Sequence, residues 1–200
     1  MDLNKDRRPL QAKQTMDYEE FSKTLKYLLD AAWGDKWGFF SEEGPNQTDP
    51  KIITYPFITH SLEEFEPGYV GKSTKEIKPR IRFLDNHGTN GNNPPITAIY
   101  GQVMQGVLVF RVFEENNAKV NALAKRLRST LAIYTGYLKE LGLKELIFQS
   151  QKVGPSVIRD NCESRELRYL ISFEELNEVP FDILRVIEVV EKNLYQELGI

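Results

Sequence analysis

A match to the end of a phosphate-binding loop is the first chemistry that the residues suggest. Gly71, Lys72 and Ser73 are the residue types that close such a loop, in which backbone N–H groups and the lysine hold phosphates. The motif also needs a glycine five positions before Gly71, where Glu66 stands, and a helix directly after it. Residues 75–83 have the pattern of a strand instead, so we predict no nucleotide site here.

A metal-dependent nuclease is the second chemistry that the residues can be tested for. Such a site needs an acidic residue and a Glu-x-Lys pair on a neighbouring strand, because carboxylates hold the ion and the lysine stabilises charge. Asp160, Glu166 and Arg168 come nearest to this pattern. Their spacing is short, and arginine stays protonated and is a poor base. We therefore predict no catalytic residues and no cofactor, and we keep a small α/β nuclease or other enzyme as the alternative class.

The histidines and the cysteine are too few for a zinc site. The sequence holds only His60, His87 and Cys162, which are scattered along the chain. A single cysteine excludes a disulfide within the chain and fits a reducing compartment. A lone cysteine without a neighbouring histidine is more often inert than reactive. We predict no metal site.

A row of basic residues is the remaining candidate for binding. Lys78, Arg80 and Arg82 alternate with apolar residues over 77–83, which predicts a strand with one basic and one apolar face. The basic face has the charge to meet phosphates. Such a row is more often the solvated side of an antiparallel strand, so both interpretations stay open.

Length and composition bound the class of protein. The 200 residues fit one domain of ordinary size. The formal net charge is -3 at pH 7, so the overall positive charge of a duplex-DNA binder is absent. No apolar run approaches the roughly 20 residues of a membrane span, and the first residues hold no apolar signal core. We expect a cytosolic product, a single domain over residues 1–200 and no membrane partner.

A long helix predicted from residue 116 onward organises the rest of the chain. Its apolar residues recur at spacings of three and four, so they share one side of an α-helix and must face the core. Asn116 or Asn117 can cap the first turn, and Gly142 fits the position just after the last turn. A strand is expected to begin at Lys144 or Glu145. The expected core-facing residues are Val120, Leu123, Ala124, Leu127, Leu131, Tyr134 and Leu138.

The opposite side of this helix has an unusual composition. A free surface helix normally shows long charged side chains there. This helix instead carries small or apolar residues, which are Ala122, Ser129, Ala132, Ile133 and Gly136. Either these five residues contact another subunit or a partner, or the C-terminal helix covers them within the same subunit.

The remaining segments predict an α/β fold of the α+β kind. Further helices are expected at 17–33 and from Pro180 onward, and strands at 99–113, 146–148 and 167–173. The order of elements predicts an antiparallel or mixed sheet flanked by helices.

Polar segments fill the gaps between these elements. We predict a flexible arm at 1–14 and long loops at 41–76 and 86–95. The first loop is interrupted by a short strand at 52–58, where Pro56 indicates the edge of the sheet.

From about Tyr100 onward the chain resembles the tail terminator, or tail completion, proteins of long-tailed bacteriophages. Three stretches carry the resemblance: YGQ at 100–102, which opens a strand, IYTGYLKELGLKELIF at 133–148 and ESRELRYLISFEE at 163–175. They lie in the expected order within residues 100–175, a span of somewhat under half of the chain.

This resemblance implies a structural virion protein of the tail or neck, assembled in the host cytoplasm, and not an enzyme. Its expected role is to form a ring, typically a hexamer, on the head-proximal end of the tail tube. There it ends tail polymerisation and offers a joining surface to the head connector. The implied partners are other copies of the chain, the tube protein, the connector or stopper protein and, in a contractile tail, the sheath protein. A head-tail neck adaptor that contacts the portal is the nearest structural alternative.

Two features of the sequence can be interpreted within such a ring. Arg111 stands in an apolar strand pattern, where it either pairs with an acidic residue across the ring or extends its head to the sheet margin, which is more common. Lys78, Arg80 and Arg82 would line the channel through which DNA passes. Tight binding to phosphates would hinder that passage, so the resemblance implies DNA in passage only.

Overall fold

The computed structural model describes residues 15–34, 37–42, 55–70, 74–85, 97–154 and 162–180. The predicted arm at 1–14, the loop at 86–95 and the helix after Pro180 lie outside the described residues, as do His87, Asp160 and Gly71 to Ser73. The chain divides into two compact units, Met1–Glu66 with Met104–Glu174, and Pro67–Val103 with Glu175–Ile200. We call them unit 1 and unit 2. A single domain over residues 1–200 stays a prediction.

The elements form a mixed sheet with two helices, which confirms the α+β fold. The sheet order is β1-β2-β6-β8-β7, and β5 also pairs with β6. β1 runs parallel to β2, whereas β5 is antiparallel to β6 and β7 to β8. β3 and β4 form a separate antiparallel pair. The bounds are α1 Tyr18–Trp33, β1 Phe39–Ser41, β2 Phe57–Pro67, β3 Tyr69–Val70, β4 Thr74–Lys75, β5 Arg80–Asp85, β6 Thr97–Glu114, α2 Asn117–Glu140, β7 Glu145–Val153 and β8 Glu163–Pro180.

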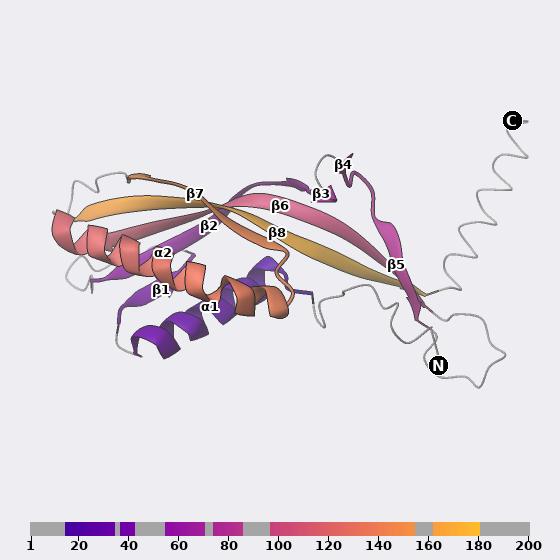
Figure 1. Ribbon diagram of the computed structural model, residues 1–200, viewed down its shortest axis with the longest axis horizontal. Helices are drawn as coiled ribbons and strands as arrows, with labels where there is room; N and C mark the ends of the chain where they lie inside the picture. Colours follow the sequence, from indigo (N-terminus) through magenta and orange to yellow (C-terminus); the bar gives the residue numbers. More distant parts are fainter. Residues whose placement is uncertain are drawn as a thin grey trace, which may run out of the picture. The chain divides into compact units, whose positions relative to one another are not determined.

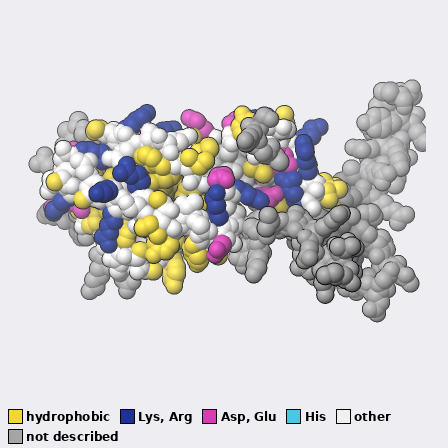
Figure 2. All heavy atoms as spheres, viewed as in Figure 1, with side chains coloured by type: hydrophobic (Ala, Val, Ile, Leu, Met, Phe, Trp, Pro, Cys, Tyr) yellow, Lys and Arg dark blue, Asp and Glu magenta, His cyan; other side chains and the backbone are white. Residues whose placement is uncertain are grey.

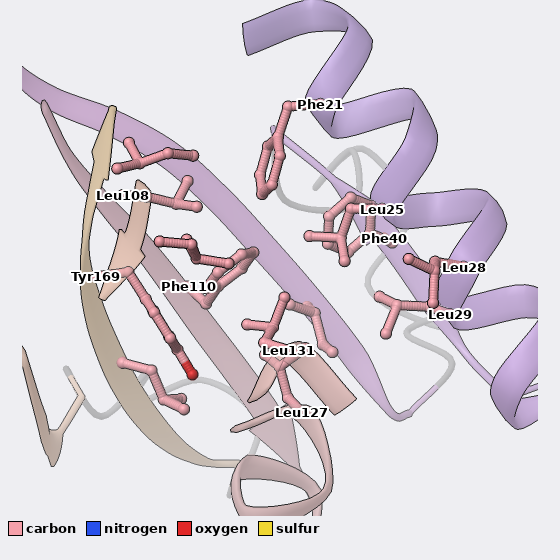
Figure 3. Close-up of a cluster of buried hydrophobic side chains, with 14 of the residues drawn as sticks. Phe21, Leu25, Leu28, Leu29, Phe40, Leu108, Phe110, Leu127, Leu131 and Tyr169 are labelled. Carbon is pink, nitrogen blue, oxygen red and sulfur yellow. The ribbon is translucent and has the colours of Figure 1, made fainter. Parts of the chain in front are cut away.

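In unit 1 both helices lie on the same side of the sheet (Figure 1). Every second residue of a strand points to the same face, and here that face meets the apolar sides of α1 and α2. Figure 3 shows side chains from both helices meeting those of β1, β6 and β8. Because these side chains leave water together, their burial is the main term that stabilises the layer. Fully buried members include Phe21, Leu25, Leu29, Leu108, Phe110, Leu127, Leu131, Leu167 and Ile171.

The long helix α2 follows the predicted pattern closely. The Asn116 side chain caps it by accepting a hydrogen bond from the Lys119 N–H at 2.9 Å. Gly142 follows the helix with φ of 117°, a conformation that only glycine adopts without strain. The strand β7 then begins at Glu145. Six of the seven predicted core residues are buried; the exception is Tyr134, which is 36% exposed.

The first helix α1 begins as predicted. Asp17 caps it through a 2.8 Å hydrogen bond from the Glu20 N–H, and Phe21, Leu25 and Leu28 are buried. Ala32, near the end of the helix, is exposed. At the end of the helix the Trp33 indole donates to Thr130 Oγ1 at 3.0 Å, which ties α1 to α2.

The long central strand and the last strand are confirmed. β6 lies between β2 and β8. On β8 the alternating residues Leu167, Tyr169, Ile171 and Phe173 are all buried, whereas Glu166, Arg168 and Glu174 are partly exposed.

The loop predicted at 41–76 is wrong over much of its length, because β2, β3 and β4 lie within it. β2 extends to Pro67, and its later residues include Glu63, Glu64 and Glu66. A strand with one solvated face carries such polar residues, which made it read as a loop. The predicted strand at 52–58 is also misplaced, since the strand begins at Phe57 and β1 lies outside it in the sheet.

Candidate functional site

The outward side of α2 is the most distinctive surface of the described residues. Ala122, Ser129, Ala132, Ile133 and Gly136, which we call the α2 outer face, are all exposed. Ile133 is 74% exposed, and a Cβ added at Gly136 would meet no atom within 4 Å. Among the described residues, therefore, none packs over Gly136. The C-terminal helix that could cover this face lies outside the described residues.

Charged side chains of α2 are held at the flanks of the α2 outer face. Arg126 lies over the Trp33 ring, 4.5 Å from its centroid, and Arg128 lies over the Phe148 ring at 5.4 Å. Lys139 pairs with Glu145 of β7 at 2.8 Å. These contacts hold three long side chains beside the α2 outer face, whereas Lys125, four residues before Ser129, is exposed on it. Figure 2 shows hydrophobic side chains interspersed with Lys and Arg side chains over this region.

The α2 outer face suits close packing against another surface rather than catalysis. Small residues let another backbone approach closely, and they lose little side-chain entropy when they become ordered. Ile133 adds a large apolar side chain that gains free energy when it leaves water.

One residue of the predicted basic row, Arg82, is paired with a buried carboxylate within unit 2. Arg82 donates two hydrogen bonds to the Glu76 carboxylate, from Nη1 to Oε1 at 2.9 Å and from Nη2 to Oε2 at 2.6 Å. Arg80 Nε lies 3.8 Å from the same carboxylate, and Lys78 is exposed. The apolar half of the pattern is also wrong, because Ile77 and Ile81 are 74% and 54% exposed. The strand β5 begins only at Arg80. Of the three basic residues, only Arg82 is thus firmly paired, whereas Lys78 and Arg80 are exposed.

Glu76 is the residue that sequence reasoning missed. It is 1% exposed, and its carboxylate also accepts a 2.8 Å hydrogen bond from the Val103 N–H. Burial alone would raise its pKa, but the hydrogen bonds from Arg82 and Val103 outweigh burial and hold the pKa below its ordinary value. The only sequence signal was an acidic residue six positions before Arg82, which a loop prediction gave no reason to pair.

A second charge cluster lies on the sheet of unit 1. Arg111 contacts Glu63 and Glu166, each at 3.3 Å, and Arg168 contacts the same two carboxylates, each at 3.4 Å. The four alternating charges close a ring of ion pairs across β2, β6 and β8. Arg111 thus pairs with acidic residues of its own chain. The sequence had suggested a partner across the ring or a position at the sheet margin. Glu166 and Arg168, two members of the nuclease-like pattern, are likewise paired.

His60 comes nearest to a base beside a nucleophile. Its Nδ1 lies 2.7 Å from the Tyr18 hydroxyl and its Nε2 lies 3.1 Å from the Ser22 hydroxyl. The ring stacks on Phe40 with centroids 4.4 Å apart, and the residue is 3% exposed. Burial lowers the His60 pKa to about 4, so the ring is neutral near pH 7. A cavity of 390 Å³ adjoins it, lined by Ser22, Lys23, Lys26, Phe40, Ser41, Glu42 and His60.

These contacts explain His60 as a buried link between α1 and β2. A neutral imidazole has one donor and one acceptor, and the two hydroxyls satisfy both. The Tyr18 pKa is raised, first by burial and then by the charge of Glu42 beside it. The Tyr18 hydroxyl is therefore a neutral partner at ordinary pH. Sequence spacing gave no signal for this cluster, because Tyr18 and His60 are 42 positions apart.

Two kinds of site are absent from the described residues. No group of three or more His, Cys, Asp or Glu side chains there is arranged to hold a metal ion. No helix in the same part of the chain is long and apolar enough to cross a membrane. Cys162 is buried and is a free thiol.

No protein-family model matches the chain, and no curated protein matches it either.

Proposed function

We propose that this chain is a structural protein of a phage tail that forms a ring on the head-proximal end of the tail tube. The ring ends tail polymerisation and provides the joining surface for the head connector. The sequence resemblance over 100–175 suggests this role. The structural observation that supports it best is the exposed α2 outer face, which includes the 74% exposed Ile133.

A ring needs a surface that binds another copy of the same chain. The α2 outer face has the composition for this, because its small residues permit close approach and Ile133 supplies apolar area. Burying one isoleucine side chain contributes about 1.5–3 kcal/mol. The gain recurs at every contact of a closed ring, so a modest gain per contact stabilises the whole assembly.

The charge arrangement agrees with DNA passing through the ring rather than binding to it. A protein that holds DNA tightly presents unpaired Lys and Arg to several phosphates. Here Glu76 holds Arg82, so of this row only Lys78 and Arg80 stay exposed. The partners in this proposal are other copies of the chain, the tube protein, the connector or stopper protein and, in a contractile tail, the sheath protein.

A substitution on the α2 outer face tests the proposal. Ile133→Asp places a charge where the proposed contact excludes water, so the variant should stay monomeric under conditions in which the unchanged protein forms rings. Tyr27→Asp is the matched control, because Tyr27 is 72% exposed on α1 of the same unit. Light scattering gives the mass, and circular dichroism verifies that each variant is folded.

The outcomes separate the alternatives. A folded Ile133→Asp protein that still forms rings as readily as the Tyr27→Asp control would remove the α2 outer face from the contact. A protein that binds the portal ring and ignores tubes would be a neck adaptor instead.

A further inference from the structure

The strand β7 leaves one edge of the unit 1 sheet without a partner strand among the described residues. β7 ends the sheet order and pairs only with β8. It is a nine-residue strand, and Ile147, Phe148 and Val153 are 49%, 38% and 76% exposed. Lys152 is its only lysine, and it holds no proline. Natural proteins usually protect such an edge, because its free N–H and C=O groups are a template for pairing.

A second open edge lies at the other end of the same sheet. β1 pairs with β2 only at Phe57, Ile58 and Thr59. Residues 60–66 of β2 therefore have β6 on one side and no described strand on the other. This stretch is acidic and partly apolar, because it holds Glu63, Glu64 and Glu66 and the 43% exposed Phe65.

We infer that β7 of one copy pairs with residues 60–66 of β2 in the next copy, so that the sheet continues from subunit to subunit. This inference rests on the ring of the proposed function. A ring made by rotation needs two different surfaces on each subunit, one that donates and one that accepts. The two open edges satisfy this need, since each copy supplies one of each kind at opposite ends of its sheet.

Charge and position favour a second copy of the chain as the occupant. After Glu145, β7 carries no acidic residue and carries Lys152, whereas residues 60–66 carry the exposed Glu64 beside Glu63, which is already paired with Arg111 and Arg168. β7 also adjoins the α2 outer face, since Lys139 of α2 pairs with Glu145 and Arg128 lies over Phe148. The β7 edge and the α2 outer face are thus neighbouring parts of one surface. Hydrogen bonds between the two strands would fix the orientation of one copy relative to the next.

Engineered cysteines test the pairing directly. In a Cys162→Ala background, Phe65→Cys is combined in turn with Ser150→Cys, Gln151→Cys and Lys152→Cys, which covers neighbouring registers. Paired strands lie about 4.8 Å apart, within the reach of a disulfide. After mild oxidation of the protein, alone and mixed with tail tubes, we expect one of these pairs to give a ladder of covalent oligomers up to the ring. Phe65→Cys with Tyr27→Cys should give no ladder.

The other outcomes overturn the inference in distinguishable ways. Covalent dimers from a variant with a single cysteine in β7 would mean that β7 pairs with β7 of a second copy. Rings without crosslinks from any of the pairs would refute the edge pairing and leave the proposed function standing. A protein that forms no ring, alone or on tubes, would overturn both.

A second variant avoids any dependence on register. Lysines on an edge strand discourage pairing, so Ile147→Lys with Val153→Lys should weaken ring assembly at least tenfold. Both positions are exposed in the subunit, so the fold should be kept, and circular dichroism verifies it. Tyr27→Lys is the control. Assembly within twofold of the control would contradict the inference.

Discussion

Replacing Arg82 with alanine should lower the free energy of unfolding by about 3 kcal/mol. The Glu76 side chain that it contacts is fully buried, whereas the Arg82 side chain is 21% exposed. Breaking a buried ion pair costs about 3–5 kcal/mol, because one charge is left unpaired. We take the low end, since Arg82 is partly solvated and the Val103 N–H still binds the carboxylate.

Arg80→Ala is the matched control for this prediction. Arg80 carries the same charge and contacts the same carboxylate, but at 3.8 Å and with a side chain that is 63% exposed. Exposed pairs contribute about 0–1 kcal/mol, so this variant should stay close to the unchanged protein. Urea unfolding followed by circular dichroism measures both variants.

The pH dependence gives this prediction a second readout. The Glu76 pKa in the folded protein is below its ordinary value of 4.5, so its contribution to stability is present above about pH 4.5 and is lost as the pH falls through the folded pKa. The difference between the unchanged protein and Arg82→Ala should therefore narrow at acid pH. Equal losses of stability for Arg82→Ala and Arg80→Ala would refute the view that Glu76 is paired chiefly with Arg82.

Four further predictions concern single residues in unit 1. Because the His60 pKa is lowered from 6.5 to about 4, stability should fall by about 3 kcal/mol as the pH drops from 6.5 to 4, and His60→Gln should flatten that slope in urea titrations. Tyr18→Phe leaves His60 Nδ1 without its 2.7 Å partner and should cost about 1–3 kcal/mol, whereas a loss as small as that of the exposed Tyr27→Phe would show the bond to be unimportant. Gly136→Ala should stabilise the subunit by about 0.5–1 kcal/mol, because alanine is more stable than glycine inside a helix and the added Cβ would have no atom within 4 Å. Gly106→Ala should destabilise it by about 1–3 kcal/mol, because its Cβ would lie 2.8 Å from Leu62, and thermal unfolding measures both glycine variants.

The helices could be predicted from the sequence because their signals are local. Asn116, Gly142 and the apolar stripe of α2 lie within one continuous stretch, and each obeys a rule about near neighbours. The central strand β6 was found for a similar reason, since it is apolar over most of its length.

The errors arose where a pattern depends on distant residues. β2 read as a loop because its second half is rich in glutamate, and two of its polar side chains, those of His60 and Glu63, find partners far along the chain. Arg82 was predicted to lie on a basic face, because no residue close to it in the sequence indicated Glu76 as its buried partner. Spacing predicts which side of an element a residue occupies, but not which residue meets it there.

The residues of the α2 outer face illustrate both what a local pattern predicts and what it does not. The sequence shows that these five residues are small or apolar, and the structure places all five on an exposed side of the helix. The local pattern does not name the surface that would meet them in the proposed ring.

The most direct test of the proposed ring is the mass of the purified protein by light scattering, alone and after mixing with tail tubes of the same phage, followed by negative-stain imaging. Closed rings, or protein that caps one end of each tube, are the expected result. A monomer that leaves both tube ends bare and lets the tubes keep growing would contradict the proposal.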